Sequence, residues 1–194
     1  MANSNSPFGF ATSGHLEGSA PTQGLSTRTI SSGYTTAIYS GDAIIPLSTG
    51  YIGQAAAAGA VQLAGVFMGC KYLNSSLGRT VWSPYWPGSG AGGDVVAYIN
   101  ADPDASFRVQ AYNTAITFAD IGNNVDIHVA AGNTYTGFSG MTADQSTLGA
   151  TTTLPFRIVG LQNSNLPGGD TTTAYNQIFV TFNYQAYKTQ TGVA

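Results

Sequence analysis

Hydrophobic and polar residues alternate with a period of two along much of this chain. In residues 106–111 (S-F-R-V-Q-A), Phe107 and Val109 alternate with an arginine and a glutamine. In residues 177–187 (Q-I-F-V-T-F-N-Y-Q-A-Y), large apolar side chains again fall on every second position. This period is typical of strands that bury one face and expose the other.

One block departs from strict alternation and therefore predicts an irregular strand. Residues 61–72 (V-Q-L-A-G-V-F-M-G-C-K-Y) alternate large and small side chains, but the alternation changes phase at Gly65. A phase change at a glycine predicts a β-bulge at that position. Residues 79–85 (R-T-V-W-S-P-Y) predict a second strand after a turn, and Pro84 and Pro87 predict that this strand ends there or lies at a sheet edge.

Short segments of this kind recur along the chain, separated by glycine, proline, asparagine and aspartate. We expect strands within residues 29–40, 44–47, 51–52, 61–72, 79–85, 94–99, 106–111, 115–121, 125–130, 155–161 and 177–187. Residues 54–60 are alanine-rich and predict at most one helical turn, and residues 134–153 predict a surface excursion. The pattern therefore predicts an all-β protein, a single antiparallel β-sandwich or barrel that is jelly-roll-like.

The two ends of the chain lack this pattern and set the expected boundaries. We expect an extended N-terminal arm over residues 1–27, the β domain over 28–187 and a C-terminal tail over 188–194. The composition of the arm leaves two interpretations open. It is either a disordered tail, or an arm that becomes ordered by burying its two phenylalanines on a neighbouring subunit.

Charged residues are scarce, which changes the expected setting of the domain. Only 8% of the 194 residues are charged, and the net charge is −3. The six basic residues are scattered, so no cluster offers the counterion release on which nucleic-acid binding depends. A free monomer with so little surface charge has weak protection against self-association, whereas a subunit fixed in an assembly does not need it. We therefore expect an assembly subunit with no direct nucleic-acid contact.

The sequence also bears on membranes and export. The opening residues (M-A-N-S-N-S-P) do not combine a charged segment with a following apolar run, and no stretch reaches the ~18 apolar residues of a membrane span. We expect no membrane partner and synthesis in the cytoplasm.

Residues that carry chemistry are few. Cys70 is the single cysteine and the two histidines lie far apart, so the sequence predicts no metal site and no cofactor. Ser139 lies in G-F-S-G-M, which lacks the final glycine of a nucleophile elbow. Asp102 and Asp104 flank a proline, for which we favour a plain turn over a pair of calcium ligands. The sequence therefore predicts a protein that is not an enzyme.

Trp82, Tyr85 and Trp86 form the densest group of aromatic residues in the chain. One interpretation is a surface platform for a carbohydrate or a protein partner, because aromatic side chains offer large and rigid contact areas. The other interpretation, which we favour, is a corner of the hydrophobic core.

Three stretches resemble the capsid decoration (cement) proteins of tailed bacteriophages, the small β-rich proteins that accompany the major capsid protein in short-tailed phages. The stretches are residues 3–15 (N-S-N-S-P-F-G-F, then His15), 65–87 (G-V-F-M-G-C-K-Y, then V-W-S-P-Y-W-P) and 95–110 (V-V-A-Y-I-N-A-D-P-D-A-S-F-R-V-Q). The resemblance covers nearly the whole chain, and the middle block is its most specific part. Where that family often has a basic residue soon after the Pro-Phe-Gly-Phe segment, this chain has A-T-S.

The resemblance implies a virion structural protein without catalytic residues. Such a protein binds the outer surface of the capsid, cements neighbouring major capsid subunits and stabilises the mature head. It implies a homotrimer, with a homodimer as the alternative. Two other functions stay open: another virion component near the tail or fibres, and a glycan-binding module for host attachment.

The arm supplies the candidate contacts with the capsid or a neighbouring subunit. These candidate residues are Pro7, Phe8, Phe10, His15 and Leu16. On this hypothesis, deletion of residues 2–16 abolishes capsid binding and leaves the β domain folded.

Overall fold

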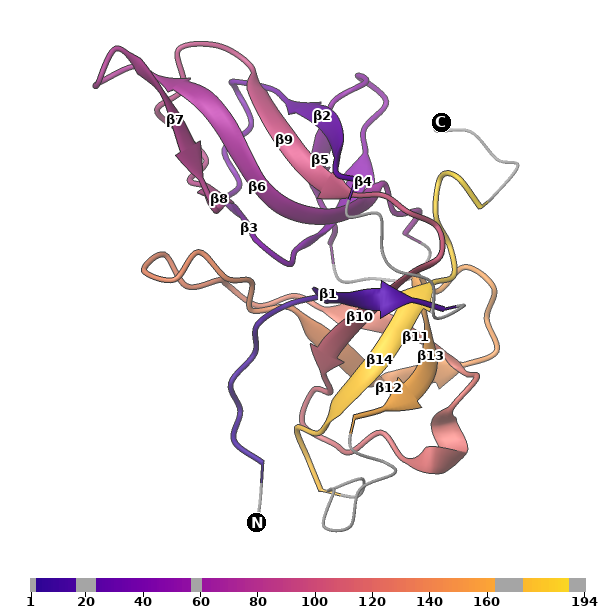
Figure 1. Ribbon diagram of the computed structural model, residues 1–194. Coiled ribbons are helices and arrows are strands. Elements are labelled where there is room, and N and C mark those ends of the chain that lie inside the picture. Colours follow the sequence, from indigo (N-terminus) through magenta and orange to yellow (C-terminus); the bar gives the residue numbers. More distant parts are fainter. Residues whose placement is uncertain (1–2, 17–23, 57–60, 163–172, 189–194) are drawn as a thin grey trace.

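The computed structural model describes residues 3–16, 24–56, 61–162 and 173–188. Nearly all of its regular structure is antiparallel β-sheet, and the described residues contain one 3₁₀ turn, η1 (Phe118–Asp120), and no α-helix. The sheets pack together, as expected of a sandwich (Figure 1). The prediction of an all-β fold is confirmed.

The lower sheet in Figure 1 contains six strands. In spatial order they are β1 (Ala11–His15), β10 (Ala105–Gln110), β14 (Gln177–Phe182), β13 (Phe156–Leu161), β11 (Asn124–His128) and β12 (Thr142–Gly149). Every neighbouring pair is antiparallel. The strand β12 returns toward β10 through an isolated bridge between Ala111 and Ala143, so the sheet curls around its own inner face.

The upper sheet is centred on the long strand β6. Its strands in spatial order are β2 (Ser26–Ile30), β9 (Val95–Asn100), β6 (Gly65–Asn74), β4 (Ala43–Pro46) and β5 (Ile52–Gln54), and β7 (Arg79–Ser83) also pairs with β6. Two short strands, β3 (Ile38–Tyr39) and β8 (Tyr85–Trp86), form a separate antiparallel pair. This pair contacts β6, so it covers one face of the upper sheet.

Two hydrophobic cores lie within these layers. The lower core contains Phe10, Phe107, Val109, Ile116, Val125, Ile127, Phe156, Ile158, Ile178, Val180 and Phe182. The upper core contains Ile30, Ile38, Ile44, Ile52, Phe67, Trp86, Val95 and Ile99. Four residues from the part of the chain that builds the upper sheet belong to the lower core, so the two layers share apolar contacts. They are Ala43, Ala55, Leu63 and Val66.

The alternation seen in residues 106–111 explains how β10 is placed. Phe107 and Val109 are fully buried and point into the lower core. Gln110 is buried as well, although it is polar, because its Nε2 donates to the carbonyl oxygens of Ser4 (2.9 Å) and Tyr175 (3.0 Å). At Gln110 both faces of β10 are therefore covered by other parts of the chain, although the alternating sequence predicts that one face is exposed.

Two predictions between residues 115 and 153 are wrong. Residues 115–121 do not form a strand, because the Asp120 carboxylate accepts hydrogen bonds from the backbone N–H (2.7 Å) and the hydroxyl (2.8 Å) of Thr117 and closes the η1 turn. Residues 142–149 form the edge strand β12 rather than a surface excursion. This polar strand is held by backbone pairing with β11, which a hydrophobicity pattern does not detect.

The irregularity predicted in β6 exists but lies elsewhere. The register against β9 shifts between Phe67 and Gly69 rather than at Gly65. Gly65 is required for another reason, since a Cβ there would lie 2.5 Å from the carbonyl oxygen of Asn100. The helical turn expected within residues 54–60 is not formed at Gln54, which belongs to β5, and residues 57–60 lie outside the described residues.

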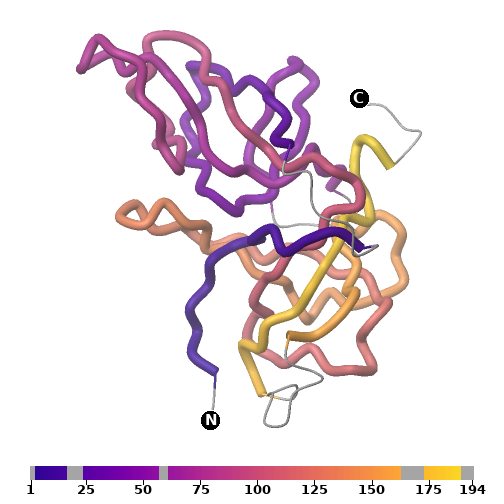
Figure 2. Tube along the Cα trace, viewed as in Figure 1, coloured from indigo at the N-terminus to yellow at the C-terminus, as the bar shows by residue number. Residues whose placement is uncertain are grey.

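An N-terminal arm that extends away from the body is not confirmed. Residues 3–16, named here the N-terminal segment, run along the lower sheet, where β1 pairs with β10 (Figure 2). The expected arm residues 17–23 and tail residues 189–194 lie outside the described residues.

Candidate functional site

The N-terminal segment is attached to the body by a buried aromatic side chain. Phe10 is 1% exposed, and its ring stacks on Phe156 with 4.2 Å between ring centroids. Its backbone N–H donates to the carbonyl oxygen of Gly41 at 2.9 Å. Phe10, a candidate partner contact, therefore fills the core of its own chain.

The other candidate residues of the segment lie nearer the surface. Pro7 and Phe8 are half-buried, and the guanidinium carbon of Arg108 lies 5.0 Å from the centre of the Phe8 ring. Leu16 is 42% exposed. The structure thus brings these residues to one sheet edge, with Phe10 pointing inward and Leu16 outward.

His15 closes the end of β1 against the turn that follows β9. Its Nε2 lies 2.6 Å from Oδ2 of Asp102, while Oδ1 of Asp102 accepts from the backbone N–H of Asp104 at 3.0 Å. Oδ1 of Asn100 accepts in turn from the backbone N–H of Asp102 at 3.2 Å. These contacts use the Asp102 carboxylate to shape the turn and to hold the N-terminal segment.

The three clustered aromatics of the sequence are separated in space. Trp86 is fully buried in the upper core, where its Nε1–H donates to the carbonyl oxygen of Tyr34 at 3.0 Å. Tyr85 is half-buried and stacks on Tyr39 at 5.3 Å. A surface platform made of all three is therefore wrong, because a core side chain of this size cannot also face solvent. For Trp86 the core interpretation holds.

Trp82 is the exposed member of the group and has different partners. It is 67% exposed, its ring stacks on Tyr98 at 5.2 Å, and the ammonium group of Lys71 lies 5.3 Å from the ring centre. The registers of β7 and β9 against β6 explain why these side chains lie together. Trp82 lies opposite Lys71, and Tyr98 lies opposite Gly69, which has no side chain to separate the two rings. Sequence reasoning missed Tyr98, because only the strand register places it beside Trp82.

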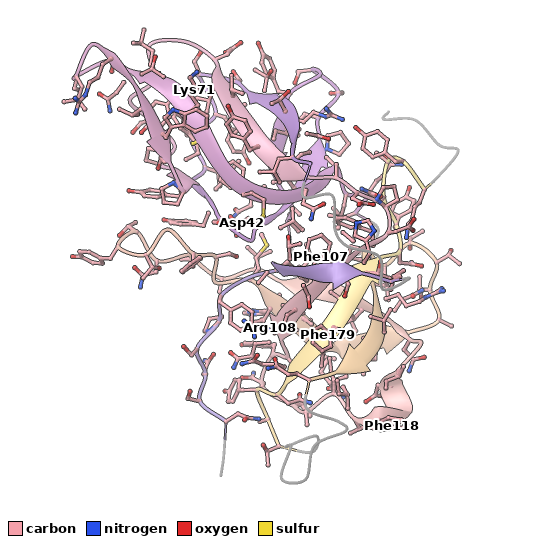
Figure 3. The ribbon with its side chains drawn as sticks, in the orientation of Figure 1. Asp42, Lys71, Phe107, Arg108, Phe118 and Phe179 are labelled. Carbon is pink, nitrogen blue, oxygen red and sulfur yellow. The ribbon has the colours of Figure 1, made fainter. Side chains whose placement is uncertain are left out.

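Further apolar side chains extend this surface. We name as the upper outer face the exposed or half-exposed side chains of Leu25, Leu73, Trp82, Val96 and Tyr98. A shallow pocket of about 370 Å³ lies beside it, lined in part by Met68 and Pro84. Figure 3 shows Lys71 on the viewer's side of the upper sheet, on the same face. This surface can bind an apolar partner, and the ammonium group of Lys71 can add one charged contact.

One ionisable side chain is fully enclosed where the upper and lower layers meet. Asp42 is 0% exposed, and its Oδ2 accepts from the backbone N–H of Tyr39 and from Nε2 of Gln54, both at 2.8 Å. Burial raises the pKa of Asp42, and hydrogen bonds from Ser139, Tyr39 and Gln54 partly offset that effect. The hydrogen bonds from Tyr39 and Gln54 fix the Asp42 carboxyl in place at the junction of the two layers.

Groups suited to catalysis or metal binding are scarce in the described ranges. Burial raises the pKa of the Cys70 thiol to about 12, so the reactive thiolate is not formed at neutral pH. Within residues 3–16, 24–56, 61–162 and 173–188, no three His, Cys, Asp or Glu side chains gather as they would around a metal ion. No helix within the described residues is long and apolar enough to cross a membrane.

Comparison with known proteins yields no relative. No protein-family model matches the chain, and neither the curated proteins nor the solved structures contain a match.

Proposed function

We propose that this chain is a virion structural protein that binds the outer surface of a phage capsid and cements neighbouring major capsid subunits. The observation that carries the proposal is the upper outer face, where Trp82 is 67% exposed beside other exposed apolar side chains. Soluble monomers rarely leave large apolar patches in water, and such patches mark interaction surfaces. The resemblance of residues 65–110 to decoration proteins supplies the nature of the partner.

The scarcity of charge supports the same proposal. With 8% charged residues, most of the exposed surface is covered by neutral side chains, which cost less to desolvate at a protein interface than charged ones do. A cement protein that binds the assembled shell and not its separate subunits stabilises the shell by mass action. The proposed partners are the major capsid protein and further copies of this chain, arranged as a homotrimer.

A surface substitution is a sharper test of capsid binding than deletion of the N-terminal segment. Deletion of residues 2–16 would remove Phe10 from the lower core and uncover the edge of β10, so it would damage the fold together with any binding surface. Trp82→Ala removes a large exposed side chain and leaves both cores intact.

The experiment mixes purified chain with expanded capsids that lack decoration protein and measures bound copies by sedimentation. A tryptophan at the centre of an interface typically contributes at least 2 kcal/mol, so Trp82→Ala should weaken binding by roughly 30-fold. Phe118→Ala is the matched control, because Phe118 is 70% exposed on η1, away from the upper outer face. A wild-type chain that does not bind capsids would refute the proposal.

A second measurement separates a cement protein from a tail or fibre component. Quantitative mass spectrometry of purified virions gives the copy number relative to the major capsid protein. A copy number close to that of the major capsid protein agrees with a coat over the whole head. A few copies per particle would instead assign the chain to the tail or fibres.

A further inference from the structure

The loop between β11 and β12 projects from the body and is closed by local hydrogen bonds. Residues 131–140 extend from the body on the left of Figure 1. Oδ1 of Asn133 accepts from the backbone N–H groups of Tyr135 (2.8 Å) and Thr136 (3.3 Å), and the Asn133 N–H donates to the carbonyl oxygen of Phe138 at 2.9 Å. These local bonds close a turn and present Tyr135 at its tip, where it is 99% exposed.

The base of the loop is fixed to the upper layer. The Ser40 N–H donates to the carbonyl oxygen of Gly137, and the Ser139 N–H donates back to that of Ser40, both at 2.9 Å. Gly137 has φ +75°, and a Cβ there would lie 2.6 Å from the ring of Pro84. The base of the loop is therefore held by Ser40 and Pro84 as well as by β11 and β12, so little backbone freedom is left there to lose on binding.

A groove of about 750 Å³ runs between this loop and the first residues of the N-terminal segment. One wall consists of residues 5–8, and the other of residues 131–136 and 138–140. Its volume falls within the range of small-molecule binding sites. The two walls are far apart in the sequence and approach each other at Gly9, where a Cβ would lie 2.5 Å from the Cβ of Ser139.

The lining of the groove combines two kinds of uncharged group. Tyr135 and Phe138, which is 54% exposed, supply aromatic surface. Asn5, Ser6 and Thr134 supply exposed amide and hydroxyl groups. None of the described residues that line the groove is an aspartate, glutamate, lysine, arginine or histidine. A charged ligand would find no counter-charge among these lining residues, and a purely apolar one would leave the amide and hydroxyl groups unused.

We propose that this groove binds a neutral oligosaccharide. A pyranose ring presents apolar C–H faces that pack on aromatic rings, and it presents hydroxyl groups that exchange hydrogen bonds with amides and hydroxyls. Tyr135 supplies the stacking surface, and Asn5, Ser6 and Thr134 supply the polar contacts. The inference is independent of the capsid proposal, which concerns the upper outer face.

The test screens wild-type protein on an array of neutral and acidic oligosaccharides and measures the affinity for each hit by ligand-observed NMR. A neutral glycan should bind, Tyr135→Ala should weaken that binding at least tenfold, and Tyr135→Phe should retain it because the ring remains. Trp82→Ala should bind the glycan as wild type does, since Trp82 lies outside the groove. Because Tyr135 is 99% exposed, an unchanged unfolding midpoint for Tyr135→Ala is expected and shows that the variant is folded.

Three outcomes would overturn the inference. They are the absence of any neutral glycan among the hits, a hit that withstands Tyr135→Ala, and a hit that is lost with Trp82→Ala instead. If Tyr135→Ala abolishes capsid binding while no glycan binds, the groove is a protein interface, and the capsid proposal survives without the glycan site. If glycans bind but capsids do not, the capsid proposal fails alone.

Discussion

The two cores of this protein are built from different side chains and by different means. In the lower core, four phenylalanines pack against one another, with centroid distances of 4.2 Å for Phe10–Phe156 and 4.9 Å for Phe107–Phe182. The upper core is mainly aliphatic, and its three aromatic residues are Phe67, Tyr72 and Trp86. The lower core also takes Phe10 from the N-terminal segment, whereas the upper core takes all its residues from positions 30–101.

This difference extends to the surfaces. The N-terminal segment covers the edge of β10 and part of the lower layer, and it buries the polar side chain of Gln110 there. No such segment covers the upper outer face in the described residues, and Trp82 and Leu73 stay exposed on it. The comparison shows that the lower layer is completed by its own chain, while the upper layer keeps an exposed apolar surface.

The largest expected effect breaks the lower core. Phe10→Ala removes a fully buried ring that stacks on Phe156, and a buried Phe→Ala change typically costs about 3–5 kcal/mol of stability. We expect a loss of this size in urea unfolding followed by tryptophan fluorescence and by circular dichroism. Since the tryptophans lie in the upper layer, a circular dichroism transition that precedes the fluorescence change would show that the lower layer unfolds first.

Phe118→Ala is the control for this experiment, because the same side chain is removed from a site that is 70% exposed. Its effect should stay within about 0.5 kcal/mol. A Phe10→Ala loss as small as that of the control would mean that the N-terminal segment does not contribute to the lower core in solution.

The next effect concerns the point where the N-terminal segment crosses the junction of the two layers. Gly9 has φ +73°, and a Cβ there would lie 2.5 Å from the Cβ of Ser139 and 2.7 Å from the carbonyl oxygen of Gly41. Gly9→Ala combines left-handed backbone strain with overpacking and should cost about 2–4 kcal/mol.

Gly14→Ala provides the matched control in the same segment, because a Cβ at Gly14 has no neighbour within 4 Å. We expect its midpoint of thermal unfolding to stay close to that of wild type or to rise slightly, as the unfolded chain loses freedom. Equal effects of the two substitutions would contradict the close packing of Gly9 against Ser139 and Gly41.

The strands with strong alternation could be predicted from the sequence, and the polar strand could not. In β10, Phe107 and Val109 mark the buried face directly. In β12 (T-A-D-Q-S-T-L-G), the apolar signal is weak, because the strand lies at an edge and is held by its backbone pairing with β11. Residues 115–121 show the converse case, where the Thr117–Asp120 hydrogen bonds form a turn in a segment that alternates like a strand.

The candidate sites were less predictable, because they depend on contacts between distant parts of the chain. A Phe-Gly-Phe segment has the same sequence whether Phe10 packs on its own chain or on a neighbour. The sequence indicated that Trp82 belongs to an aromatic group, but its stacking on Tyr98 follows from the registers of β7 and β9 against β6. Likewise, the groove beside Tyr135 is lined by residues 5–8 and by residues of the loop between β11 and β12, which are far apart in the sequence.

A smaller effect concerns the pH dependence at the junction of the two layers. Because burial raises the pKa of Asp42 above its unfolded value of 3.8, the folded chain holds this proton more tightly than the unfolded chain. The stability that Asp42 contributes is therefore complete below the unfolded pKa and is lost as the pH rises through the folded pKa. Asp42→Asn cannot ionise and escapes that loss.

Urea unfolding of both proteins from about pH 3 to about pH 8 measures this difference directly. The stability of Asp42→Asn relative to wild type should rise with pH and then level off above the folded pKa. Subtracting the two curves cancels the carboxyls common to both proteins, including Asp94, whose pKa is lowered by hydrogen bonds from Ser32 and Tyr51. A difference that falls with rising pH would show that the Asp42 carboxylate is stabilised rather than penalised by its surroundings.

The smallest effect on stability should come from the open face of the upper layer. Trp82 is 67% exposed, so Trp82→Ala loses only the stacking on Tyr98 and the contact with Lys71, and we expect a change within about 1 kcal/mol. The same substitution should reduce self-association in sedimentation velocity, because it removes the largest side chain of the upper outer face. These two results together would sharpen the contrast between the layers: Phe10 would act on folding, and Trp82 on association. A large loss of stability without a change in association would instead make the upper outer face a structural surface, and the proposed partner contact would have to lie elsewhere.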